Sequence, residues 1–404
     1  MLASTSSVDA ATRPAGWETG PTSPRALSGD VRRRVRFHST EPGASLRTHD
    51  SATKARVAER LSDFLGYAYA DVDQPEQGVT GRAIESAPGY LVPSDTLVGL
   101  DHAHRLGVVT VDDLFGGVVP HKFVATKLIS HGLVGPMADA PEGWSHDFGR
   151  RTRQAVLPGY SVFSLGDALL AGELMLDDGA VRVKHPFGVG GRGQWVARDR
   201  AELHARLSTF DAEDIRTQGL VIERNLRQVL THSVGQVQAG PLTISYHGTQ
   251  TLTTNHRGHE VYGGSTLRVI RGAFDDLLRE ALAPAVRQAV EQAVAYHHAA
   301  MGCFHGMFAS RCNYDVAQGT DDQDRFHSGV LEQSWRIGGA SGAEVAALHA
   351  LGADAGLHSV TASTCELYAD NVAVPAGAWL LYDGDDPQVG RLTKYAQVLS
   401  HVDD

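Results

Sequence analysis

A short β-branched run that ends on a lysine and leads into a glycine-rich loop is the most constraining feature of this sequence. The run from Val181 ends on Lys184. The glycines of the following loop are Gly188, Gly190, Gly191 and Gly193. Glycine adopts positive φ without steric cost, so such a loop can direct several backbone N–H groups toward one anion. The pattern fits neither a dinucleotide-binding helix nor a P-loop. It predicts another kind of phosphate clamp, in which Lys184 supplies the positive charge.

A second stretch, much later in the chain, adds a carboxylate and an arginine. If Gly329–Arg336 is an extended strand, the side chains of Glu332, Ser334 and Arg336 share one face of it. Carboxylates suit Mg²⁺, and an arginine can stabilise charge that develops during phosphoryl transfer. Glu332 alone also fits a plain exposed strand acid. Together with the glycine loop, the stretch predicts an ATP site in which Lys184 and Arg336 have catalytic roles.

A third segment is a candidate for contacts to adenine. The apolar run Gly219–Glu223 predicts a strand, and Asn225 follows where this strand ends. A hinge between two domains can present the donor and acceptor that adenine needs. Glu223 and Asn225 are therefore candidate nucleotide-binding residues, although an ordinary turn explains the same residues.

In combination, these motifs resemble the ATP-grasp superfamily, in particular its biotin carboxylase and carbamoyl phosphate synthetase branch. Lys184 with its loop is similar to a strand lysine followed by Gly-Gly-Arg-Gly, and Glu332 to Arg336 is similar to a Glu-x-Asn-x-Arg motif. Ala125-Thr126-Lys127, followed by Leu157-Pro158-Gly159, resembles the first ATP lysine and the loop beyond it. The resemblance covers about residues 120–345, and the whole chain looks like a distinct bacterial family within the superfamily.

The resemblance implies an α/β (α+β) fold. ATP would be sandwiched between two α+β subdomains, behind an N-terminal α/β pre-ATP-grasp domain. The implied cofactors are ATP and Mg²⁺ or Mn²⁺, with Lys127 joining Lys184 and the glycines at the phosphates. The expected ranges are a disordered tail over 1–48, the N-terminal domain over 49–125, subdomain 1 over 126–225 and subdomain 2 over 226–404. Helical spacing further predicts helices over 52–65, 275–301 and 343–351.

The metal ligands implied by the resemblance are Glu332, Asp315 and Ser334. Ser334 stands where the family has Asn and is a shorter, weaker ligand. The first metal carboxylate is expected on the strand from Gly306 to Val316, where Asp315 is the only acid. By simple alignment, Asn313 or Ser310 also fits that position. Ile337–Ser341 replaces the biotin carboxylase motif beyond the arginine, and no biotin-acceptor domain is seen, so bicarbonate carboxylation is not supported.

The composition restricts the classes of partner that this protein is expected to bind. A formal net charge of −11 argues against a nucleic-acid binder, and the basic run Arg32–Arg36 reads as part of a solvated tail. No apolar run is long enough for a membrane span, which argues against a membrane partner. Three cysteines without a paired pattern favour a reducing compartment, and hence the cytoplasm. Small-molecule carboxylate and amine substrates are the expected partners, with a homodimer as one option for assembly.

Three functional hypotheses remain open. The leading one is an ATP-dependent ligase that phosphorylates a carboxylate and then transfers the acyl group to an amine or thiol. The second is a kinase-like phosphotransfer on the same fold. The third is a non-catalytic ATP-binding regulatory module, for which Ser334 and Asn313 in the metal motifs are the motivation.

Overall fold

The computed structural model describes residues 33–40, 48–71, 89–188 and 193–403. These described residues group as one compact unit. Within the described residues, antiparallel and parallel sheets are combined with helices on their faces, which confirms the α+β class. No described helix is long and apolar enough to cross a membrane.

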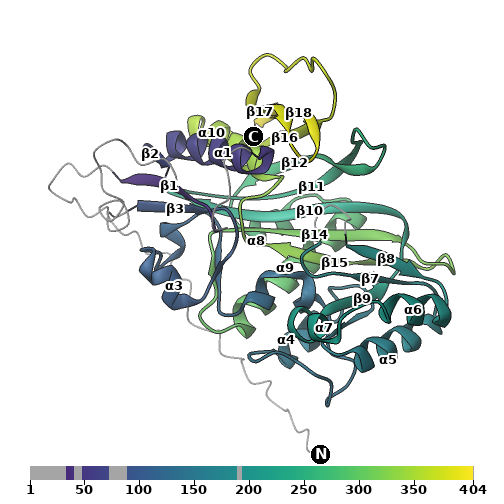
Figure 1. The fold of residues 1–404 in the computed structure, drawn as a ribbon. Coiled ribbons are helices and arrows are strands. Elements are labelled where there is room, and N and C mark those ends of the chain that lie inside the picture. The colour runs from purple at the N-terminus through teal and green to yellow at the C-terminus, as the bar shows by residue number, and fades with distance from the viewer. Residues whose placement is uncertain (1–32, 41–47, 72–88, 189–192, 404) are drawn as a thin grey trace, which may run out of the picture. The chain divides into compact units, whose positions relative to one another are not determined.

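A large antiparallel sheet runs through the described chain (Figure 1). In spatial order its strands are β15 (Phe326–Ser334), β14 (Arg311–Thr320), β10 (Arg227–Ala239), β11 (Leu242–Thr254), β12 (Glu260–Arg271), β16 (Leu357–Leu367), β18 (Gly390–Asp403) and β17 (Trp379–Asp386). Alternate residues of β14 face opposite sides, because successive side chains of a strand point to opposite faces. Cys312 and Tyr314 enter one apolar core, whereas Arg311 and Asn313 face the other side.

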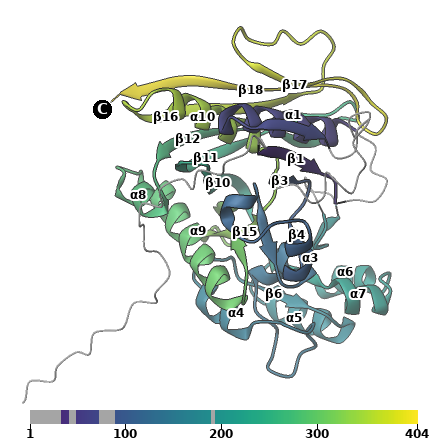
Figure 2. The same ribbon diagram turned by 90° about the vertical axis from the view of Figure 1, so that its left-hand side faces the viewer.

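Helices cover both faces of this sheet. Helix α10 (Ser341–Ala353) and helix α1 (His49–Leu65) pack together on one face, and α9 (Pro284–Cys303) packs on the other (Figures 1 and 2). The first eight residues of α10 are all buried, so this helix is a core element with Glu344 as its single acid. The helices expected over 52–65 and 343–351 thus correspond to α1 and α10.

The helix expected over 275–301 is wrong as one continuous element. The structure divides it into α8 (Phe274–Arg279) and α9, which starts at Pro284. Proline has no backbone N–H and is tolerated in the first turn of a helix but not inside one. The apolar spacing continues across the break, whereas the backbone does not.

A smaller antiparallel sheet carries the glycine loop. Its strands, in spatial order, are β6 (Gly159–Val162), β9 (Leu220–Arg224), β7 (Val181–Lys184) and β8 (Gln194–Ala197). The helices around it are α5 (Leu165–Leu176), α6 (Arg200–Leu207) and α7 (Ala212–Gln218). The side chains of α5, α6 and α7 share one apolar core with this sheet. Lys127 lies in the second of two short 3₁₀ turns, Lys122–Ala125 and Lys127–Ser130.

Part of the segment that was expected to be a disordered tail is a strand of a parallel three-stranded sheet. Its order is β2 (Ala68–Asp71), β1 (Arg34–His38), β3 (Gly89–Pro93), so β1 is the central strand although 1–48 was expected to be disordered. Val35 and Phe37 are buried in the core, and the Arg36 guanidinium donates to the Leu106 carbonyl. The basic residues led to the expectation of a solvated tail, but along strand β1 they alternate with the buried Val35 and Phe37. Residues 1–32 and 41–47 lie outside the described residues.

The remaining elements connect these layers. A fourth sheet pairs β4 (Leu97–Val98), β5 (Gly117–Val119) and β13 (Phe308–Ala309). The short helices α3 (Leu100–Arg105) and α4 (His146–Thr152) and the 3₁₀ turn Val111–Asp113 complete the described elements. The expected ranges for the N-terminal domain and the two subdomains stay predictions.

Candidate active site

Lys184 lies in a buried charge cluster rather than at an open surface. Its Nζ is 2.5 Å from Glu223 Oε1, and His131 Nε2 lies 3.3 Å from Glu223 Oε2. The Lys184 and Glu223 side chains are 9% and 2% exposed. Burial alone would raise the pKa of Glu223, but the charge of Lys184 and the His131 contact outweigh it and lower this pKa to about 2. The cluster therefore holds a permanent carboxylate against the lysine of the predicted phosphate clamp.

The second lysine connects the glycine loop to the large sheet. Lys127 Nζ lies 2.6 Å from Glu332 Oε2 and donates to the carbonyl oxygen of Gly188 at 2.9 Å. The base of the loop is closed where His185 N donates to Gly193 O at 2.8 Å, and Gly193 has a φ of +70°. Gly190 and Gly191 lie outside the described residues. The structure thus brings Lys127, Glu332 and both ends of the glycine loop to one place.

Asp315 and Glu332 are direct cross-strand partners on β14 and β15. Such pairs place their Cβ atoms about 5 Å apart, so two carboxylates are held side by side. Burial raises the pKa of Asp315, and the neighbouring Glu332 charge raises it further, to about 6, against hydrogen bonds from Gln250 and Asn313 that lower it. Two crowded carboxylates with one Lys127 counter-charge form a donor set suited to a hard divalent cation.

Within the described residues, the candidate metal site contains two carboxylates, those of Asp315 and Glu332. Among the described residues, no group of three or more His, Cys, Asp or Glu side chains could hold a metal ion. An Mg²⁺ or Mn²⁺ ion at this position would therefore take two protein carboxylates and complete its shell with phosphate oxygens and water, as Mg²⁺ commonly does. The residues fit such an ion.

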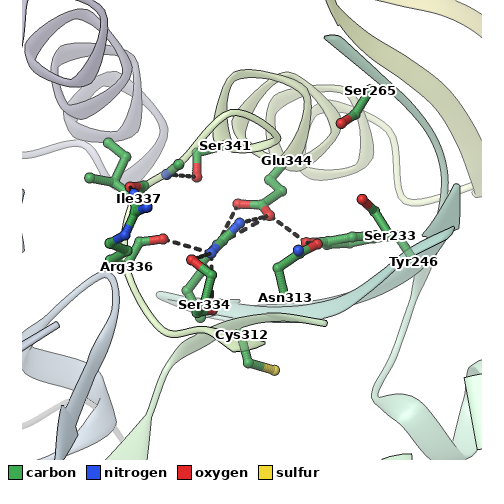
Figure 3. Close-up of polar contacts among 12 residues, drawn as sticks. Ser233, Tyr246, Ser265, Cys312, Asn313, Ser334, Arg336, Ile337, Ser341 and Glu344 are labelled. Carbon is green, nitrogen blue, oxygen red and sulfur yellow. Dashed lines mark hydrogen bonds and ion pairs between the residues drawn. The ribbon is translucent and has the colours of Figure 1, made fainter. Parts of the chain in front are cut away.

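Ser334, the third predicted metal ligand, belongs to a different polar cluster (Figure 3). Its Oγ accepts a hydrogen bond from Arg311 Nη1 at 3.1 Å, so a guanidinium already occupies its neighbourhood. Opposite it in the sheet, Asn313 donates through Nδ2 to Asp315 Oδ1 at 2.8 Å. The alternative Ser310 donates to the Leu114 carbonyl, away from both carboxylates. Assignment of Ser334 to the metal stays a prediction.

Arg336 lies beyond the strand on which it was expected. Strand β15 ends at Ser334, and Arg336 occupies the following bend, so the expected shared strand face stops at Glu332 and Ser334. Its side chain is 30% exposed, with Nε 3.5 Å from Asp95 Oδ1, and Nη1 donates to the Ile337 carbonyl. The exposure leaves this guanidinium open to a ligand.

Neither candidate for adenine contact has a free side chain. The Glu223 carboxylate is engaged by Lys184 and His131, and Asn225 Oδ1 accepts a hydrogen bond from Arg182 Nη2 at 2.8 Å. The Asn225 backbone N–H donates to Ala180 O. The role of Glu223 and Asn225 at adenine stays a prediction.

We expect Lys184 to be a main nucleotide contact, but its test must account for the buried Glu223. Lys184→Ala alone would leave an unpaired buried carboxylate, which costs about 3–5 kcal/mol of folding free energy. The double variant Lys184→Met/Glu223→Gln keeps the shape and removes both charges. ATP affinity of this variant, measured by calorimetry, should fall about 10- to 100-fold. Thermal melting of the double variant is the control and should show that the protein remains folded. Unchanged affinity of the folded double variant would contradict the role of Lys184.

A family model matches residues 37–396, which is most of the chain, and its description reads "Protein of unknown function (DUF3182)". The chain belongs to the DUF3182 family. The match runs from within strand β1 to within strand β18 and includes every predicted site residue. A search of curated proteins found no match.

Solved structures show how this DUF3182 chain is folded. Biotin carboxylase from Campylobacter jejuni is 12% identical, with a TM-score of 0.51 over 91% of this chain and 87% of that chain. Pyruvate carboxylase from Rhizobium etli gives the same identity and TM-score over 91% of this chain and 36% of that longer chain. At this identity the likeness shows the fold alone. It confirms the expected ATP-grasp fold.

Three residues that matter for the site's geometry were not predicted from the sequence. His131 joins Glu223, and the buried pair of Arg311 and Glu344 braces the segment after β15. No local pattern marks His131 or Arg311, since each meets its partner across a large separation in sequence. One signal was present for Glu344, because it is the lone acid of a mostly apolar helix.

Proposed function

We propose that the protein is an Mg·ATP-dependent ligase. It would phosphorylate a carboxylate substrate to an acyl phosphate and then form an amide with an amine, or a thioester with a thiol. The likeness to ATP-grasp structures supports the fold of such an enzyme, and the chemistry is inferred from the chain's own residues. A small soluble carboxylate and a small amine or thiol would be its substrates, in the cytoplasm.

One observation carries the proposal. Lys127 contacts Glu332 and the glycine loop at Gly188, and Glu332 faces Asp315 across the β14–β15 ladder. Phosphoryl transfer needs cations at the triphosphate and carboxylates for a divalent ion in the same place. Three segments that are distant in sequence supply both kinds of group within contact distance of one another.

Each residue has a defined task in this proposal. Lys127 and Lys184 would bind phosphate oxygens, Lys127 by exchanging Glu332 for the nucleotide and Lys184 by sharing its ammonium with Glu223. Asp315 and Glu332 would hold Mg²⁺, which neutralises charge on the phosphates when bound. Arg336 would stabilise the charge on the phosphorylated carboxylate. The glycine loop would cover the triphosphate and exclude water, so that ATP is not hydrolysed without substrate.

The test is a product analysis against a panel of amino acids, small peptides and other carboxylic acids. We expect slow ATP cleavage alone, and faster release of ADP and inorganic phosphate with the correct acid. Hydroxylamine in place of the natural nucleophile should trap the acyl group as a hydroxamate. AMP and pyrophosphate would contradict the acyl-phosphate route, and ADP without free phosphate would indicate a kinase.

A regulatory ATP-binding module is the second candidate. The specific observation for it is that all three predicted metal ligands already have protein partners. Lys127 pairs with Glu332, Asn313 donates to Asp315, and Arg311 donates to Ser334. Such a module would bind ATP tightly and turn over none of the acids in the panel. The same assay therefore separates the two candidates.

A further inference from the structure

A buried ion pair lies beneath the segment that carries Arg336. Arg311 at the start of β14 is 1% exposed, and Glu344 on α10 is 0% exposed. Arg311 Nη2 lies 2.7 Å from Glu344 Oε1, and Nε lies 3.0 Å from Oε2, so the contact is bidentate. Burial alone would lower the pKa of Arg311, but Glu344 outweighs it and raises this pKa above its ordinary value. The guanidinium is therefore a fixed, charged fork.

The remaining donor of that fork is directed at one short segment of backbone. Arg311 Nη1 donates to Ser334 O at 3.1 Å and to Arg336 O at 2.6 Å. These two carbonyls flank Trp335, whose indole is buried in the opposite core and donates to Tyr314 O–H at 3.0 Å. The chain before Arg336 is thus held from both faces of the sheet. The direction in which the Arg336 side chain leaves the backbone depends on this attachment.

The same ion pair reaches the carboxylate side of the site. Tyr246 O–H lies 2.5 Å from Glu344 Oε1 and 3.0 Å from Asn313 Oδ1. Asn313 in turn donates to Asp315 Oδ1. One continuous set of contacts therefore runs from Arg336 to Asp315. Its intermediate members are, in order, Arg311, Glu344, Tyr246 and Asn313.

We propose that Arg311, oriented by Glu344, is a positioning residue that fixes Arg336 and Asp315 relative to each other. This inference rests on the ligase function proposed above. A buried ion pair is poor evidence for stability, because apolar replacement of both partners is often neutral or stabilising. Apolar side chains cannot donate hydrogen bonds to the two carbonyls, and they cannot accept one from the Tyr246 hydroxyl. The pair therefore has its main effect on geometry at the site.

The decisive variant replaces both partners, as Arg311→Met/Glu344→Met. Single variants would leave a buried unpaired charge and unfold the chain for an uninformative reason. The double variant should melt within a few degrees of wild type. Hydrogen exchange of backbone amides over residues 334–338, measured by mass spectrometry, should become about 10- to 100-fold faster. The kcat with the active acid should fall by a similar factor, while the KM for ATP changes only a few-fold.

Two further variants separate positioning from general stability. Arg271 donates to the carbonyls of Leu351 and Asp354 at the other end of α10, so Arg271→Met is the matched control. It should lower the melting temperature without changing exchange at 334–338. Tyr246→Phe removes the hydroxyl that lies between Glu344 and Asn313 and leaves the Arg311–Glu344 ion pair in place. It should weaken Mn²⁺·ADP binding, measured by electron paramagnetic resonance, and leave exchange at 334–338 as in wild type.

The outcomes test the positioning role of Arg311 and the ligase function separately. An active wild-type enzyme whose double variant keeps normal exchange at 334–338 and normal kcat would overturn the positioning role and leave the ligase in place. A wild-type protein that neither binds Mn²⁺·ADP nor turns over any acid would overturn the ligase function. In that case the exchange measurement still decides whether Arg311 holds the segment.

Discussion

Glu332→Gln should abolish turnover while leaving metal-free nucleotide binding within a few-fold of wild type. The glutamine keeps the size of the side chain and can still accept a hydrogen bond from Lys127, so the fold should be retained. What is lost is one of the two carboxylates that face each other across β14 and β15. We expect kcat to fall at least about 100-fold, because the charge stabilisation that depends on the cation is lost with it. ADP release and calorimetry measure the two quantities separately.

A pH series supplies the control for this variant. The pKa of Asp315 is raised from its ordinary value of 3.8 to about 6, so the folded state binds this proton more tightly than the unfolded state does. In metal-free buffer, the wild-type free energy of unfolding should therefore decline between about pH 4 and pH 6 and level off above pH 6. Asp315→Asn should lack this decline, and Glu332→Gln should reduce it, because the neighbouring charge is gone. Normal turnover of folded Glu332→Gln would mean that the carboxylate is structural.

Arg336→Met should remove acid-stimulated ATP cleavage and the hydroxamate product. Arg336 is 30% exposed and its partner Asp95 is 62% exposed, so the ion pair between them adds little to stability. Loss of one group that stabilises transition-state charge typically costs about 10²- to 10³-fold in kcat. ATP affinity should stay within a few-fold, because Lys127 and Lys184 remain to bind the phosphates.

Two variants control this experiment. Arg336→Lys keeps the charge without the planar fork and should retain part of the stimulated rate. Asp95→Asn removes the exposed partner alone and should leave kcat nearly unchanged. If Arg336→Met lowers ATP affinity and spares the stimulated rate, the arginine binds nucleotide and has no role at the carboxylate.

The ATP-grasp fold could be predicted from the sequence because its motifs are local. A strand lysine before a glycine loop, as at Lys184, and a carboxylate four residues before an arginine, as at Glu332 and Arg336, each lie within one short stretch of sequence. Local apolar spacing likewise predicted α1 and α10. The same method failed where local signals conflicted. Strand β1 was not predicted, because charged residues alternate with its apolar ones. One long helix was predicted in place of α8 and α9, because the apolar spacing continues across the break before Pro284.

The partners of those residues were decided only by the tertiary structure. Sequence placed Asp315 and Glu332 on two strands, but the antiparallel register made them neighbours. It named Lys184 and Lys127 as cations, whereas packing gave each of them a carboxylate, Glu223 and Glu332.

The contrast is sharpest at Arg311, which no motif marks. Its contacts with Glu344 and with the backbone at Ser334 and Arg336 join segments that are far apart in the chain. The sequence by itself determined which chemical groups this protein possesses and the fold that carries them. Which groups meet depended on strand register and helix packing, because contacts between distant segments form only when the whole sheet and its helices pack together.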